Sequence, residues 1–203
     1  MRELDHSEIE RLVRDLILPF YHIKREIPLP IGERRFENDA EHSWSLAVLA
    51  CSIASVVDSE LDVGKVCQIA TAHDMVEVFA GDTSVFSQSD LLDSKDERER
   101  QALDKIKNEF NRFPWLADTI SEYKTRRSNE AKYVYALDKY ITVLFDFLDE
   151  GKYIKDLKMS HADYTRHFSV HRQKAHEHPA VAAYYDKVRD LLDLHPEYFY
   201  VKE

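Results

Sequence analysis

Three separated stretches of the sequence carry histidine and carboxylate side chains on otherwise apolar segments. The stretch "CQIATAHDMVEVFAGDT" contains adjacent His73 and Asp74, and Glu77 follows four residues after the histidine. In a helix this spacing places all three side chains around one face. Because Val66 and Ile69 precede them on that side, we expect the imidazole and the carboxylates to point toward the interior. An unpaired buried charge is costly, and a bound cation is a common way to offset it.

Two further segments also carry a potential metal ligand among apolar residues. In "RFENDAEHSWSLA", His42 follows capping and first-turn acids and begins an apolar stripe at helical spacing. In "EAKYVYALDKYITVLFDFL", Asp138 lies on the apolar side of a predicted helix. We therefore predict that four side chains from three helices converge on one metal ion, namely His42, His73, Asp74 and Asp138.

Each of these positions also has a simpler interpretation. A lone buried histidine such as His42 is more often a satisfied core or capping residue than a ligand. Asp138 can instead pair with Lys132 or Lys139 at a helix surface, where ion pairs contribute little. The joint pattern, with a ligand type on each of three apolar helix faces, favours the metal site.

The predicted ligand set limits the identity of the ion. Two imidazoles and two carboxylates suit one divalent ion of manganese, cobalt, zinc, iron or nickel, and no thiolate-rich set indicates a structural zinc. Such an ion lowers the pKa of its bound water and polarises a coordinated phosphoryl oxygen. Hydrolysis of a phosphate ester is the reaction that this site would serve best.

The elements that position these residues are predicted to be helices. The 203 residues include only 4 glycines and 6 prolines, and apolar residues recur at steps of three and four. We predict one all-α domain with a structured loop at 24–38 and helices at roughly 6–20, 39–57, 62–80, 95–112, 129–150, 160–176 and 179–194.

Charge and composition exclude several classes of partner. The formal net charge of -10, without a stripe of lysine and arginine, argues against a nucleic-acid polymer. A small anion is still compatible, because one local positive site can outweigh the average. The charged N-terminal stretch is unlike a signal peptide, and we expect no apolar run of membrane-spanning length. Cys51 and Cys67 are expected to be buried thiols, so a cytoplasmic protein without a membrane partner is predicted.

The C-terminal stretch "HADYTRHFSVHRQKAHEHP" holds five histidines. His167 and His171 share a helical face, as such a pair does in some zinc sites. No glutamate occupies the positions between them as in the HExxH pattern, and the surroundings are polar. We predict a solvated helix here.

The ordered set "RFENDAEHSWSLA", "AHDMVEVFAGDT" and "SNEAKYVYALDKY" resembles the HD-domain metal-dependent phosphohydrolases, named for the pair seen here as His73 and Asp74. More narrowly, the sequence is similar to the 5'-deoxynucleotidase branch. The resemblance implies a single-domain HD helical bundle over 1–203, with a motif-bearing core at about 24–150 and C-terminal helices at about 160–194. It also implies a homodimer or a higher homo-oligomer.

Residue roles follow from the same resemblance. It implies that His42, His73, Asp74 and Asp138 are the metal ligands, as the residue pattern alone predicts.

Three further residues receive roles only through the resemblance. Glu77 would help activate the nucleophilic water or pass a proton, and Asp82 would donate a proton or position the substrate. Arg25 would bind the phosphate, to which a guanidinium is suited. Arg35 is expected to tether the loop to a helix N-terminus through Glu37 rather than to contact substrate, and Arg34 is a lesser candidate.

The sequence departs from that branch near the expected sugar pocket. Thr83 and Ser84 follow the glycine-aspartate pair, where the deoxynucleotidases carry an apolar residue and a proline. The stretch "EIPLP" follows Arg25, where they carry a tryptophan. The preference between deoxyribose and ribose is therefore open.

The leading functional hypothesis is a metal-dependent phosphomonoesterase that converts (deoxy)nucleoside 5'-monophosphates to nucleoside and phosphate. A second hypothesis keeps the metal chemistry and changes the substrate to another small phosphorylated metabolite or nucleotide. A third is a helical binding module in which the metal is structural and no reaction is catalysed.

Overall fold

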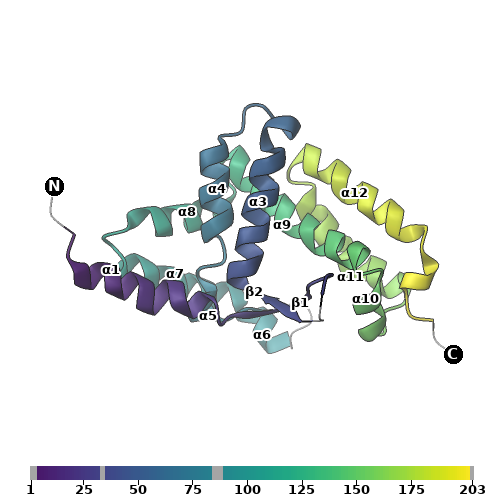
Figure 1. Cartoon of the computed structure of the whole chain (residues 1–203), viewed down its shortest axis with the longest axis horizontal. Helices are drawn as coiled ribbons and strands as arrows, with labels where there is room; N and C mark the ends of the chain where they lie inside the picture. Colours follow the sequence, from purple (N-terminus) through teal and green to yellow (C-terminus); the bar gives the residue numbers. More distant parts are fainter. Residues whose placement is uncertain (1–3, 33–34, 84–88, 202–203) are drawn as a thin grey trace.

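Two long helices form the centre of the molecule, α3 (Asp39–Val57) and α9 (Asn129–Leu148), and the shorter α4 (Val63–Ala72) packs against both (Figure 1). The computed structural model describes residues 4–32, 35–83 and 89–201. Within that part of the chain, helices dominate and the sheet is a single pair of strands. The expected all-α fold class is confirmed.

Buried aliphatic side chains from the three central helices meet in one core. Leu46, Ile69 and Leu137 are almost wholly excluded from solvent there. The hydroxyl of Tyr133 donates a hydrogen bond of 2.9 Å to the carbonyl of Ala50, which joins α9 to α3 through the same core. Because the three helices share this core, their relative positions are fixed. The polar side chains that they carry are therefore also held in fixed positions.

Side-chain caps set the residue at which each central helix begins. The side chain of Asn38 accepts a hydrogen bond from the backbone N–H of Glu41, whose carboxylate accepts one from the N–H of Asn38. This reciprocal pair is a capping box, and it fixes the start of α3. Ser128 and Asp62 cap α9 and α4 in the simpler way, through one side-chain oxygen each.

The remaining elements surround this centre. They are α1 (His6–Leu12), the π-helical turn η1 (Val13–Ile17), α2 (Leu18–Phe20), β1 (Lys24–Pro28), β2 (Phe36–Asn38), α5 (Glu77–Ala80), α6 (Ser89–Asp93), α7 (Lys95–Glu109), α8 (Pro114–Thr125), α10 (Lys152–Asp156), α11 (His161–Ala175), α12 (Pro179–Asp193) and the 3-10 turn η2 (Pro196–Tyr198).

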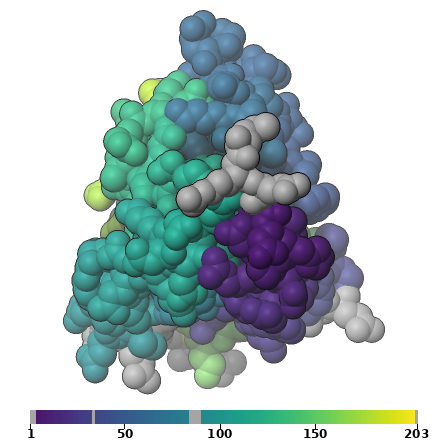
Figure 2. All heavy atoms as spheres, turned by 90° about the vertical axis from the view of Figure 1, so that its left-hand side faces the viewer, coloured from purple at the N-terminus to yellow at the C-terminus, as the bar shows by residue number. Residues whose placement is uncertain are grey.

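Two outer groups of helices pack on the centre. Buried residues of η1, α7 and α8, such as Leu16, Ile106 and Leu116, form one cluster. Figure 2 shows this face of the molecule, where the purple N-terminal segment lies against teal segments of α7 and α8. On the other side, α9, α11 and α12 share a second cluster that includes Phe168 and Tyr185.

Three local expectations need correction. The predicted helix at 62–80 is interrupted after Ala72, because the N–H groups of Met75 and Glu77 bond three residues back and tighten the chain into a turn. The predicted loop at 24–38 contains β1 and β2, an antiparallel pair with an irregular register. Helix α8 lies outside the predicted helices, although Pro114 in its first turn is a common start signal.

Two further expectations concern exposure. Cys67 is exposed rather than buried, and Cys51 is half-buried, while both thiols are free. Within the described residues, α3 is long and apolar enough to cross a membrane by length and composition, contrary to the expectation from the sequence. The core helix of a soluble protein passes the same test. One face of α3 contributes Leu46 and Ala50 to the core, whereas Trp44 on another face is exposed.

The corner between α9 and α10 depends on Gly151. Its φ of +67° is in the left-handed region, and a Cβ placed there would overlap the backbone of Tyr198, whose carbonyl oxygen would lie 2.5 Å away. Gly32 has nearly the same φ of +68°, but a Cβ added there would meet no atom of the described residues within 4 Å. Alanine at Gly32 would therefore introduce backbone strain alone, whereas alanine at Gly151 would introduce both backbone strain and steric overlap.

We predict that Gly151→Ala lowers the free energy of unfolding by about 2 to 4 kcal/mol. The cost of a left-handed backbone at alanine and the cost of the overlap with Tyr198 both contribute to this loss. Gly32→Ala introduces the strain alone and should lose about 1 kcal/mol. Urea unfolding of both variants measures the difference. Equal losses would contradict the close approach of Tyr198 to this corner.

Candidate metal centre

His73 presents one ring nitrogen free for a ligand. It lies just after the last residue of α4, with its side chain buried, and its Nδ1 donates a hydrogen bond of 2.9 Å to the carbonyl of Ala70. That bond leaves the lone pair on Nε2, which is buried and has no hydrogen-bond partner among the described residues. The nearest charged atom is Oδ2 of Asp74, at 3.1 Å from Nε2. A backbone hydrogen bond on the second nitrogen is how metal-binding histidines are usually oriented.

His42 lies in the first turn of α3 and faces His73, with ring centroids 5.5 Å apart. Its Nε2 is 3.1 Å from Oδ1 of Asp138, which comes from the middle of α9. Its Nδ1 is 3.2 Å from Oε1 of Glu37 on β2. The imidazole is thus held between two carboxylates from different elements.

The donor atoms of these residues form two adjoining groups. One atom from each of His42, His73 and Asp138 lies within 4.8 Å of the others. A second group of the same size joins Asp74 to Asp39 and Glu77. Asp74 touches both groups, because its Oδ2 lies against Nε2 of His73.

This donor set fits a divalent cation. The free Nε2 of buried His73 is an unused ligand atom, and imidazole and carboxylate together suit the transition metals expected from the sequence. The structure brings His42, His73 and Asp138 together, and Asp74 adjoins them through its contact with His73. Their role as ligands stays a prediction.

Arg25 makes contacts that the sequence did not indicate. From β1, its Nη1 lies 2.9 Å from Asp74 and 3.4 Å from Asp39, and its Nε lies 3.2 Å from Glu37. Burial alone would lower the pKa of Arg25, but the surrounding carboxylates raise it well above its usual value. Arg25 therefore balances the negative charge of the centre as well as lining the cavity in front of it.

Burial and neighbouring charges shift the pKa values of the second carboxylate group and of Asp82. Burial, followed by the negative charge of Asp74, raises the pKa of Asp39 to about 7. Burial and the same neighbour raise the pKa of Glu77 well above its ordinary value. Burial also raises the pKa of Asp82, although Arg25 opposes this shift. Burial acts in the same direction on Asp74, but contact with His73 and Arg25 outweighs it, so the pKa of Asp74 is lowered.

Two buried acids of this network were missed as functional residues. The sequence indicates Asp39 only as a capping or first-turn acid, and its side chain is fully buried beside Asp74. Glu37 was expected to pair with Arg35, but Arg35 pairs with Glu41 at 2.8 Å. The spacing of Asp39 three residues before His42 was a signal, since it places both on the same side of the helix. Arg34 and Ser84 lie outside the described residues.

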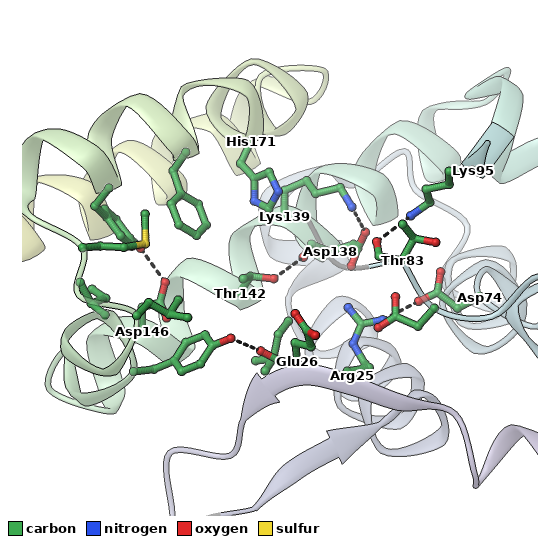
Figure 3. A pocket seen from close by; sticks show the side chains of 18 of the residues that line it. Arg25, Glu26, Asp74, Thr83, Lys95, Asp138, Lys139, Thr142, Asp146 and His171 are labelled. Carbon is green, nitrogen blue, oxygen red and sulfur yellow. Dashed lines mark hydrogen bonds and ion pairs between the residues drawn. The ribbon is translucent and has the colours of Figure 1, made fainter. Parts of the chain in front are cut away.

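A cavity of about 880 Å³, counting its opening to solvent, lies in front of the centre (Figure 3). Asp74, Glu77 and Asp138 line it. The hydroxyl of Tyr153 on α10 donates a hydrogen bond of 2.5 Å to the carbonyl of Glu26, which connects α10 to β1 beside the cavity. The other lining residues are Arg25, Ile27, Asp82, Thr83, Lys95, Lys139, Thr142, Asp146, Ile154, Leu157, Met159, Tyr164, Phe168 and His171.

Helix α11 is not the solvated helix that was expected. His171 is buried and lines the cavity, and Phe168 beside it packs in the cluster that α9, α11 and α12 share. Lys139, which the sequence offered only as a surface partner for Asp138, also lines the cavity while its ammonium contacts the Asp138 carboxylate. The polar stretch around His171 concealed its burial, whereas the position of Lys139 in the cavity wall follows from the packing of α9.

Comparison with known proteins identifies relatives of the chain. A family model described as HD domain matches residues 21–181. Among solved structures, the crystal structure of a predicted metal-dependent phosphohydrolase from Magnetospirillum magnetotacticum MS-1 is similar, with a TM-score of 0.78 and 25% sequence identity. The match covers 99% of this chain and 100% of that chain. No curated protein sequence matches the chain significantly.

The protonation of His42 predicts how metal binding depends on pH. Burial and Arg25 would lower the pKa of His42, but hydrogen bonds to Asp138 and Glu37 outweigh them and raise it to about 9. A metal at Nε2 must displace this proton, so its affinity should weaken about tenfold for each pH unit below about 9. Calorimetric titration of metal-stripped protein with Mn²⁺ between pH 6 and pH 8 measures this slope.

Substitution of Glu37 by glutamine provides the check on this account. Glu37→Gln removes one carboxylate that stabilises the imidazolium, so the pH dependence of Mn²⁺ affinity should flatten. Glu41→Gln, a half-buried substitution that keeps a capping-box residue and does not contact His42, should keep the original slope. A slope that is identical in all three proteins would contradict the coupling between His42 and the metal.

Proposed function

This chain belongs to the HD-domain family, and from that membership we propose that it is a metal-dependent phosphohydrolase acting on nucleoside 5'-monophosphates, in deoxy or ribo form. The products would be a nucleoside and inorganic phosphate. The observation that carries the proposal is the group of imidazoles and carboxylates that adjoins a cavity lined by cationic side chains. The similar solved structure, described as a predicted metal-dependent phosphohydrolase, gives further support.

The residues of the centre fit the roles that such a reaction needs. His42, His73, Asp74 and Asp138 would hold the divalent ion, which when bound supplies polarisation of a phosphoryl oxygen and a lower pKa for water. The hydroxyl of Tyr123 donates a hydrogen bond of 3.0 Å to Oδ2 of Asp138 and so fixes the orientation of that carboxylate.

Positive charge in the cavity would bind the phosphate. Arg25, Lys95 and Lys139 line the same cavity as the carboxylate centre. Arg25 and Lys139 are each held by a carboxylate, so their head groups are fixed before a substrate arrives. Fixed cations of this kind stabilise the charge that develops on phosphoryl oxygens during transfer.

Two acids would move protons. Glu77 is buried beside Asp74, where its carboxylate would accept a proton from the attacking water. Asp82 also lines the cavity, and its raised pKa suits donation of a proton to the departing 5'-oxygen, with substrate positioning as the alternative role.

The experiment that tests the proposal measures phosphate release from a panel of phosphorylated compounds. The panel contains deoxynucleoside and ribonucleoside 5'-monophosphates, 3'-monophosphates and triphosphates. Metal-stripped protein is resupplied separately with manganese, cobalt, zinc and magnesium. Metal-dependent release from 5'-monophosphates alone is the expected result. If no compound releases phosphate with any of the metals, the proposal is wrong, and the chain acts on another substrate class or is a non-catalytic module.

We predict that Glu77→Gln lowers kcat by roughly 100- to 10,000-fold, because the isosteric amide cannot take a proton from water. Metal content should be unchanged, since Glu77 is outside the predicted ligand set. Glu109→Gln, a half-buried substitution on α7 outside the cavity lining, serves as the control with full activity. Wild-type turnover by Glu77→Gln would show that this carboxylate has no catalytic role.

A further inference from the structure

The far end of the cavity holds a carboxyl group that the proposed chemistry does not use. Asp146 lines the cavity and is buried, being 6% exposed. It lies two turns after Asp138 on α9, with Thr142 between them at intervals of four residues. All three therefore occupy one face of the helix. Figure 3 shows Asp146 on the opposite side of the cavity from Arg25 and Asp74.

The surroundings of Asp146 are apolar and aromatic. Ile154, Leu157 and Met159 line this part of the cavity together with Tyr164 and Phe168. The carboxyl group accepts a hydrogen bond from the hydroxyl of Tyr164, at 2.7 Å from Oδ2. Burial raises the pKa of Asp146 to about 7, against the opposing effect of that bond. A carboxyl group held at such a cost in a cavity is a candidate for ligand recognition.

The distance between Asp138 and Asp146 along α9 limits the length of the ligand that can contact both. Eight residues of α-helix separate Asp138 from Asp146, a rise of about 12 Å. A nucleoside monophosphate whose phosphate lies at the metal centre is long enough for its base to reach Asp146. An aminoalkyl phosphate with a two-carbon chain, whose ammonium would also suit a carboxylate, is too short to span both ends.

We propose that Asp146 reads the Watson–Crick edge of the substrate base by accepting its N–H groups, and that guanine is the base it prefers. The inference rests on the proposed nucleotide hydrolysis. Guanine places two N–H donors side by side, which match the two oxygens of a carboxylate. Adenine and cytosine present one amino donor beside a ring nitrogen acceptor, and uracil and thymine present one N–H between two carbonyl groups.

The neighbours of Asp146 support its role as an acceptor. The Tyr164 hydroxyl donates to it, and the positive charge of Arg189 favours its ionised form against the negative charge of Asp149. Phe168 and His171, with ring centroids 5.0 Å apart, offer aromatic surface in the wall of the same cavity. Aromatic surface of this kind packs well against the faces of a planar base.

The test measures binding of nucleosides, which carry no phosphate, to the metal-loaded full chain by titration calorimetry. Guanosine should bind about 10- to 100-fold more tightly than adenosine, as expected for a bidentate contact. Inosine, which differs from guanosine only in lacking the exocyclic amino group, should lie between them. The comparison of guanosine with inosine needs no variant, so it holds even if a substituted protein fails to fold.

Asp146→Asn should remove the preference for guanosine and leave adenosine binding unchanged. Glu150→Gln is the control, because Glu150 is an exposed acid near the same end of α9 that is not among the residues lining the cavity. Equal affinity for the three nucleosides, a preference for adenosine, or an equal loss for all of them in Asp146→Asn would each overturn the inference.

The outcome is separable from that of the proposed function. Selective guanosine binding without phosphate release from any monophosphate would support base recognition and reject nucleotide hydrolysis. Phosphate release at equal rates from all bases, with no selectivity in nucleoside binding, would retain hydrolysis and reject the role of Asp146.

Discussion

The high cost of burying carboxylates without partners governs the arrangement of this molecule. Glu37, Asp39 and Asp74 are drawn into the interior or to its edge, and each contacts the guanidinium of Arg25. Asp138 is likewise balanced, by an imidazole, a tyrosine hydroxyl and the ammonium of Lys139. Removing one member leaves uncompensated charge on several others, so the network behaves as a unit. The helices that meet at this network are positioned by the same requirement.

Local structure brings these groups together from four distant parts of the chain. The capping box at Asn38 fixes where α3 begins, so that Asp39 and His42 lie one turn apart on its inner side. The tight turn after α4 directs His73 into the interior while its Nδ1 remains bonded to the backbone. The apolar pattern suggested a continuous helix over 62–80. The observed interruption between Ala72 and Glu77 lies where the imidazole and the carboxylates of the centre are concentrated. Short irregularities of this kind are typical of functional sites.

The residues of the centre whose burial is signalled by their neighbours in the sequence could be predicted, and the others could not. His42, His73 and Asp138 were identifiable because each is a polar residue among apolar neighbours at helical spacing, which signals burial. Glu37, on a short strand, lacks such neighbours, and Asp39 offers only its spacing from His42 as a signal, so tertiary contacts were needed to show that both are buried. The partners of Arg25 and Arg35 could not be assigned either, because each arginine has several acids within reach along the chain. The polar surroundings of His171 predicted solvent exposure, but α11 packs that face against the cavity.

The hydrogen bond between Tyr153 and Glu26 has a consequence for how the site is assembled during synthesis. It joins residues 127 positions apart, and closing so long a loop costs entropy that only the later contacts offset. The residues of β1 and α3 emerge from the ribosome well before α10 does. A nascent chain can therefore gather part of its carboxylate network early, but it cannot enclose a ligand until α10 has been translated and has docked against β1.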